Sequence, residues 1–174
     1  MTAKGQMFCV CVALLLGVAG CAKPSSEVVE LKRFPLDTLD GLITRSGAAL
    51  DTETTSDGNG SLRIRATGPT TVRLFEITDV TVENARLTYQ AKLRSRNLQG
   101  QAYLEMWCHF PGRGEFFSRG LQNTVSGTMQ WITAETPFFL RKGEKPDVIK
   151  LNLVINGRGT VWIDDVRLIK GPLQ

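Results

Sequence analysis

The sequence predicts an all-β protein, an antiparallel β-sandwich of two sheets. Short segments alternate apolar and polar residues, which is the period of a strand with one buried face. Glycine, asparagine, aspartate and proline interrupt these segments at intervals typical of hairpins and loops. No amphipathic helix with a capping residue is visible after residue 27. We therefore expect about eight to ten strands that bury one face of each sheet against the other.

Each strand is predicted from the alternation of apolar and polar residues within its own segment. In 61–67, leucine, isoleucine and alanine face one way and two arginines the other. The segment 87–94 repeats the pattern with leucine, tyrosine, alanine and leucine on the apolar side. Further strands are expected over 72–76, 101–110, 131–140, 148–155 and 161–169. Turns are predicted at 57–60, 68–69, 97–100 and 156–159.

The first twenty residues have the composition of an export signal. An apolar run begins at Met7, follows the basic residue Lys4, and ends in small residues before Cys21. The run is too short for a membrane span, which needs about 20 apolar residues. The ending Val-Ala-Gly-Cys resembles the bacterial lipobox, with valine where leucine is usual. That resemblance implies removal of residues 1–20 and acylation of Cys21 with fatty chains such as palmitate. An ordinary secretory signal or a noncovalent hydrophobic anchor is the alternative.

We expect four segments along the chain. Residues 1–20 form the lipoprotein signal peptide, and 21–27 carry the lipidated cysteine and a short polar tether. Residues 28–170 form the sandwich domain, and 171–174 a C-terminal tail. Ala22 stands where enterobacterial lipoproteins retained in the inner membrane carry aspartate. The resemblance therefore implies a bacterial cell-envelope protein held by its lipid anchor, in the outer membrane rather than the inner one.

Composition argues against several classes of function. The formal charge of the 174 residues is +4, and the arginines form no run along the chain, so nucleic acid is not an expected partner. The chain has a single histidine, His109, and contains no nucleophile elbow, zinc-protease or phosphate-loop motif, so we expect no enzyme. After removal of the signal, Cys108 and Cys21 are the remaining cysteines. Cys108 is expected to be a buried small apolar residue, with pairing between molecules as the alternative.

Several segments together resemble the galactose-binding-like jelly roll of carbohydrate-binding modules. Ser56–Ile64 resembles the early D-G-x-x-S-L-x-I strand of that family, and Leu87–Arg94 its central Y-x-A-x-x-R/K strand. Ser126–Trp131 resembles the segment whose tryptophan precedes a long strand. Gly159–Leu168 resembles the terminal G-x-x-x-I-D-D-V-x-L strand. The resemblance implies a jelly roll, and its members serve as sugar binders, structural modules or protein-interaction modules.

Aromatic residues mark the candidate ligand site. In 101–110 one face is purely apolar, whereas the other mixes aromatic rings with a carboxylate and an imidazole. Such a face suits stacking on a sugar ring and hydrogen bonding to its hydroxyls. The glycine-rich loop that follows adds two phenylalanines. The candidate residues are Tyr103, Glu105, Trp107, His109, Phe116 and Phe117. The alternative is a half-exposed strand face that a loop covers.

Calcium is the one cofactor that the sequence suggests, and no cofactor is required by the expected function. Asp164 and Asp165 are adjacent on a strand and face opposite sides unless a bulge intervenes. Many members of the resembled family hold a structural calcium through an acidic residue of this strand and groups near the domain start. That implies Asp165 and Asp57 as ligands. The alternative is that the aspartate pair accepts hydrogen bonds from backbone amides at a bulge.

Two functions remain open from the sequence. The first is recognition of a glycan through the aromatic face, without catalysis. The second is a protein-interaction or structural module of a cell-envelope assembly, in which the same face contacts a partner chain. Exposure of Trp107 separates the two, since a groove with an accessible ring favours the glycan.

Overall fold

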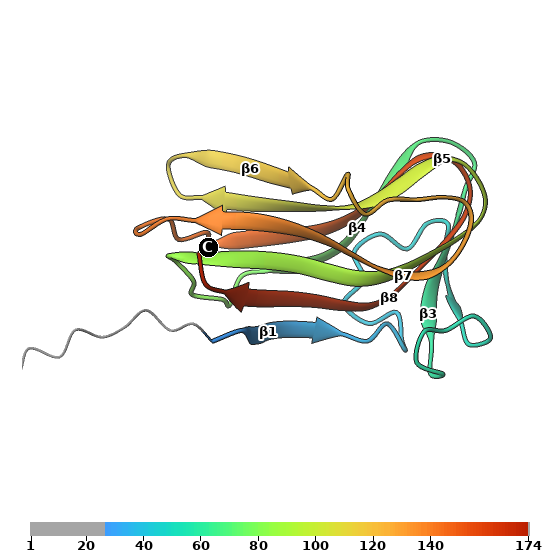
Figure 1. The fold of residues 1–174 in the computed structure, drawn as a ribbon, viewed down its shortest axis with the longest axis horizontal. Coiled ribbons are helices and arrows are strands. Elements are labelled where there is room, and N and C mark those ends of the chain that lie inside the picture. Colours follow the sequence, from blue (N-terminus) through green and yellow to red (C-terminus); the bar gives the residue numbers. More distant parts are fainter. Residues whose placement is uncertain (1–26, 174) are drawn as a thin grey trace, which may run out of the picture.

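The computed structural model describes residues 27–173, which contain strands and loops and no helix (Figure 1). The same residues therefore hold no helix long and apolar enough to cross a membrane. Lipidation of Cys21, the signal peptide and the tether boundary fall largely outside the described residues. The strands are β1 (Val29–Phe34), β2 (Ala48–Asp51), β3 (Ser61–Ala66), β4 (Thr70–Ile77), β5 (Ala85–Phe110), β6 (Gly114–Arg119), β7 (Val125–Leu140) and β8 (Val148–Gly171).

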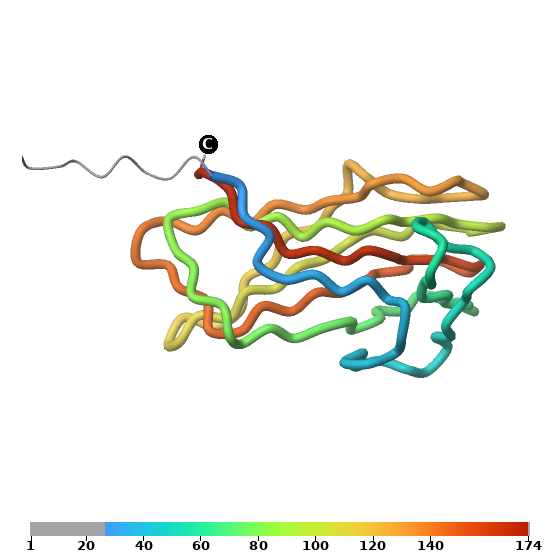
Figure 2. Tube along the Cα trace, turned by 90° about the horizontal axis from the view of Figure 1, so that it is seen from below, coloured from blue at the N-terminus to red at the C-terminus, as the bar shows by residue number. Residues whose placement is uncertain are grey.

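Two sheets arise because the longest strands serve both of them. The first half of β5 pairs with β7 and with residues 159–171 of β8, and β1 and β3 extend this sheet. The second half of β5 pairs with β6 and with residues 148–158 of β8, and β4 completes that second sheet. All these pairings are antiparallel, which confirms the predicted all-β sandwich. β1 runs beside the last part of β8, so the two ends of the described chain lie together (Figure 2).

The core lies between the sheets and draws on both halves of each long strand. In the first half of β5 the odd-numbered residues are buried, among them Leu87 and Tyr89. In the second half the even-numbered residues are buried, including Leu104 and Met106. The change of parity falls near Asn97, whose backbone φ is 52° and where the pairing is irregular. One strand thus presents an apolar face to the same core from two sides.

The predicted turns at 97–100 and 156–159 are wrong, because both segments lie inside continuous strands that bend. Their glycines serve close approach of two backbones. A Cβ on Gly100 would lie 2.1 Å from the carbonyl oxygen of Asn156, and a Cβ on Gly157 would lie 2.0 Å from that of Gln99. A side chain cannot fit at either distance. These glycines, which by sequence indicate turns between strands, instead let β5 and β8 bend together while they stay paired.

We expect Gly157→Ala to destabilise the protein by about 3 kcal/mol or to prevent folding, because the new methyl group displaces the backbone of β5. The matched control is Gly68→Ala, where nothing lies within 4 Å of the added Cβ and the backbone φ is not left-handed. The free energy of unfolding in urea measures both variants. Equal stability of the two variants would contradict the role assigned to the bend.

Candidate functional site

The outer face of the second sheet carries the predicted aromatic residues. Tyr103, Glu105, Trp107 and His109 alternate with core residues along β5, as the sequence predicts. β6 lies beside this part of β5, so that Phe117 is directly opposite Trp107 and Arg119 is opposite Glu105. Strand register therefore brings the predicted strand face and one phenylalanine of the following segment together.

The buried carboxylate of Glu105 forms hydrogen bonds to its neighbours on this face. Its side chain is 7% exposed, and its carboxylate accepts hydrogen bonds from Trp107 Nε1 at 2.7 Å and from Arg119 Nε at 2.7 Å. Asn152 Nδ2, from the neighbouring strand β8, donates to the same carboxylate at 3.3 Å. A buried carboxylate with these partners holds its neighbours in place. Glu105 thus positions Trp107 and Arg119 and has little surface of its own to offer a ligand.

Trp107 and Phe117 form the aromatic part of the site. Their ring centroids are 4.9 Å apart and the rings are tilted by 44°. The Arg119 guanidinium carbon lies 4.5 Å from the Phe117 ring centroid, within the range of a cation–π contact. Trp107 is half-buried, whereas Phe117 is 50% exposed. The more accessible ring is therefore Phe117.

The other predicted residues do not all join this pair. Tyr103 is buried at 8% exposure. His109 Nδ1 lies 2.5 Å from Asp147 Oδ1, and this hydrogen bond holds the pKa of Asp147 below its usual value. Phe116 lies opposite Cys108, and its ring meets Phe110 edge-on at 5.8 Å. The structure separates Phe116 from Phe117 by placing them on opposite faces of β6.

A groove with a volume of about 750 Å³ lies along the open side of the sandwich, between β6, the loop after it and β7. Phe117 and Arg119 line it from β6. Aromatic rings and polar side chains complete the lining, among them Gln122, Asn123, Glu135, Phe138 and Phe139. Phe139 is 53% exposed, so the groove has accessible rings on both of its sides.

Contacts between β6 and β7 close the floor of the groove. The Ser118 hydroxyl lies 2.6 Å from Thr136 Oγ1 and 2.6 Å from the carbonyl oxygen of Pro137. A Cβ on Gly120 would lie 2.6 Å from the carbonyl oxygen of Glu135, so glycine permits close approach here. Sequence reasoning missed the β7 side, since alternation shows that Phe139 faces outward but not that it lines the same groove as Phe117.

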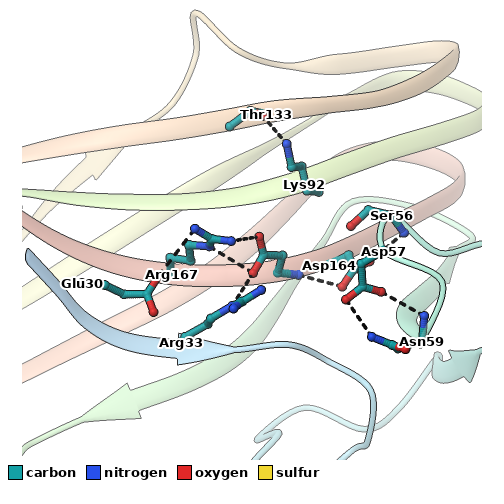
Figure 3. Close-up of polar contacts among 10 residues, drawn as sticks. Glu30, Arg33, Ser56, Asp57, Asn59, Lys92, Thr133, Asp164 and Arg167 are labelled. Atoms are coloured by element: carbon teal, nitrogen blue, oxygen red, sulfur yellow. Dashed lines mark hydrogen bonds and ion pairs between the residues drawn. The ribbon is translucent and has the colours of Figure 1, made fainter.

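The aspartate pair lies at a β-bulge in β8. Figure 3 shows Asp164 of this pair beside Ser56 and Asp57. The Asp164 side chain is fully buried, and it accepts hydrogen bonds from the backbone N–H of Ser56 at 2.8 Å and of Asp165 at 2.7 Å. Burial raises the pKa of Asp164, although these hydrogen bonds act in the opposite direction. Asp165 has a left-handed backbone with φ of 48°. Asp164 thus accepts hydrogen bonds from backbone amides at a bulge, which is the alternative to the predicted metal site.

The two predicted calcium ligands have other partners here. Asp165 accepts from Arg33 Nε at 2.8 Å and from Arg167 Nη2 at 2.6 Å. Asp57 accepts from the backbone N–H and the side-chain amide of Asn59. Within residues 27–173 no three His, Cys, Asp or Glu side chains are grouped to hold a metal ion. Calcium at Asp165 and Asp57 stays a prediction, and Asp165 would have to exchange two guanidinium partners for it.

Cys108 is buried in the core, as expected for a small apolar residue. Burial raises the pKa of its thiol to about 12, so the nucleophilic thiolate is strongly disfavoured. His109, its neighbour in sequence, lies on the opposite face of β5. The two side chains do not form a catalytic pair.

Comparison with known proteins supports the fold. No family model and no curated protein matches the sequence. The CBM22-1 xylan-binding domain of Paenibacillus barcinonensis Xyn10C is similar in structure, with a TM-score of 0.61 and 13% identity over 87% of this chain and all of that one. A C-terminal family 22 carbohydrate-binding module of Clostridium thermocellum Xyn10B has a TM-score of 0.54 and 12% identity, over 83% of this chain and 94% of that one. The chain therefore has the β-sandwich fold found in carbohydrate-binding modules.

We expect Glu105→Ala to lower the free energy of unfolding by about 2 kcal/mol, because it leaves the Trp107 indole N–H and the Arg119 guanidinium without their acceptor. The control is Glu115→Ala on the neighbouring strand β6, which removes an ion pair with Lys150 that is more exposed to solvent. Urea unfolding measures both. A Glu105→Ala variant as stable as Glu115→Ala would show that the buried carboxylate does not organise the site.

Proposed function

We propose that this protein binds glycans without transforming them, and that the groove between β6 and β7 is its binding site. One observation carries the proposal. Exposed phenylalanine rings and hydrogen-bonding side chains from two strands line a single open groove of about 750 Å³. A sugar presents apolar C–H faces and polar hydroxyl edges, and these match rings and amide or charged side chains respectively.

Individual residues take distinct roles in this proposal. Phe117 and Phe139 stack against sugar rings, and Gln122, Asn123 and Glu135 bond to hydroxyl groups. Trp107 extends the aromatic surface beside Phe117. Glu105 and Tyr103 act from below as supporting residues.

The structural neighbours indicate which ligand to test first. Two of them are described as xylan-binding domains, and their fold is the one seen here. The proposal that this chain binds xylan rests on that likeness in fold and on the groove. The absence of catalysis is likewise proposed, because Glu105 is held by Trp107 and Arg119 and has no open position beside a substrate.

A protein partner is the second candidate function. Leu121 is 56% exposed at the same groove, and together with Phe117 and Phe139 it makes an apolar edge. Such an edge also suits a partner chain of a cell-envelope assembly. The two functions differ in whether a purified polysaccharide alone binds.

We expect soluble xylan in a native gel to retard the protein, and the double variant Phe117→Ala/Phe139→Ala to bind about tenfold more weakly or worse, since two stacking rings are lost. The control is Phe116→Ala, which removes the same ring from the opposite face of β6. A panel of other neutral polysaccharides extends the assay. If none retards the wild-type protein, the glycan proposal fails and the protein-partner function stands.

We further propose that the chain is a lipoprotein of the bacterial cell envelope, in the outer membrane where the cell has two. The lipobox-like ending at Cys21 and the Ala22 that follows support this. β1 begins at Val29, only eight positions after Cys21. An extended chain of eight residues reaches at most about 30 Å, so the sandwich would stay close to the membrane surface.

We expect the wild-type protein to fractionate with membranes and to carry fatty acid, because several acyl chains anchor far more firmly than one. Cys21→Ser is expected to be unlipidated and either released or unprocessed. Metabolic labelling with a palmitate analogue and mass spectrometry of the N-terminus give the answer. An acylated, membrane-bound Cys21→Ser product would refute the anchor.

A further inference from the structure

Four arginines gather on the outer face of the first sheet, where β3, β8 and β5 lie side by side. Arg63 of β3 and Arg94 of β5 both pair with Trp162, which lies between them on β8. Two positions away on each strand, and on the same face, Arg65 and Arg96 flank Thr160 in the same way. We call these four residues the arginine platform.

Trp162 and Asp51 form a fixed floor under the platform. Trp162 is 2% exposed, and its Nε1 donates to Asp51 Oδ2 at 2.9 Å. Arg63 Nη1 donates to the same oxygen at 3.1 Å. Burial raises the pKa of Asp51, but hydrogen bonds from Trp162 and two backbone amides, with the charge of Arg63, outweigh it and leave the pKa below its usual value. Asp51 therefore stays ionised and holds the floor together.

The platform carries more positive charge than its surroundings neutralise. The guanidinium carbons of Arg94 and Arg96 lie 5.9 Å and 5.2 Å from the same Trp162 ring centroid. Among residues 27–173 no acidic side chain forms an ion pair with Arg65, Arg94 or Arg96. Like charges on adjacent positions repel one another, and stacking on a ring offsets this only in part. A bound anion would remove the remaining repulsion.

We infer that the arginine platform binds an acidic polysaccharide, one that carries carboxylates on its sugars. The planar guanidinium matches a carboxylate with two parallel hydrogen bonds. Adjacent strands are about 4.8 Å apart and alternate residues about 6.7 Å apart, so the four arginines span a patch roughly 10 Å by 7 Å at their Cα positions. One extended chain with repeated carboxylates covers a patch of that width. Because Trp162 is covered, recognition here depends on charge rather than on stacking.

The inference does not depend on the groove proposed above. The platform shares no residue with it, and the groove recognises sugars through rings and hydroxyl contacts. The two surfaces therefore predict different ligands and different responses to salt. Charge-based binding weakens as salt rises, whereas stacking is much less sensitive.

The experiment uses a fluorescently labelled polygalacturonate oligomer and the same oligomer with its carboxylates methyl-esterified, followed by fluorescence anisotropy. We expect the wild-type protein to bind the acidic oligomer at low salt, to release it at high salt, and to ignore the ester. Arg94→Gln/Arg96→Gln should bind about tenfold more weakly or worse. Should that pair fail to fold, Arg65→Gln/Arg96→Gln removes two exposed arginines and leaves the Arg94 contact with Trp162.

Matched controls distinguish binding at the arginine platform from an effect of total charge and from binding at the groove. Arg141→Gln/Lys142→Gln removes two exposed positive charges from the loop after β7 and should bind as the wild type does. Phe117→Ala/Phe139→Ala should also keep full binding, so failure of the groove leaves this test intact. The inference is overturned if the ester binds equally, if both charge-removal variants weaken binding equally, or if duplex DNA of matched charge binds as tightly as polygalacturonate.

Discussion

The close approach of the paired strands β5 and β8 at their bend is the constraint on which the rest of the structure depends. At Gly100 and Gly157 the two backbones approach so closely that neither position has room for a Cβ. Because both strands bend there while remaining paired, each contributes one half to each sheet. The two sheets of the sandwich are therefore joined by continuous hydrogen-bonded strands as well as by loops.

The bend also explains where the two outer surfaces lie. Residues before it in β5 present their even-numbered side chains outward, and these include Arg94 and Arg96 of the platform. Residues after it present odd-numbered side chains outward, including Glu105 and Trp107. One strand thus supplies a basic surface to one sheet and an aromatic surface to the other. The two sheets therefore have chemically different outer faces.

Both faces use the same local arrangement. On each, a buried carboxylate accepts a tryptophan indole N–H and an arginine N–H, with Asp51 serving Trp162 and Glu105 serving Trp107. A carboxylate that is shielded from solvent and hydrogen-bonded to both groups holds the indole ring and the guanidinium in fixed positions relative to each other. The difference lies in what covers the ring. Arginines lie over Trp162 and bury it, whereas Trp107 is half-buried beside the exposed Phe117.

The fold class, the strand faces and the burial of Cys108 could be predicted from the sequence, because they follow from alternation within single segments. The sequence also placed Trp107 and Phe117 in the candidate site. Tertiary structure alone decided that the glycines near 100 and 157 mark a shared bend of two paired strands, that Phe139 and Phe117 line the same groove, and that Arg63 and Arg94 flank one tryptophan. The physical reason is register. Residues more than twenty positions apart in the sequence become neighbours only when their strands come together, and no local pattern encodes which strands will do so.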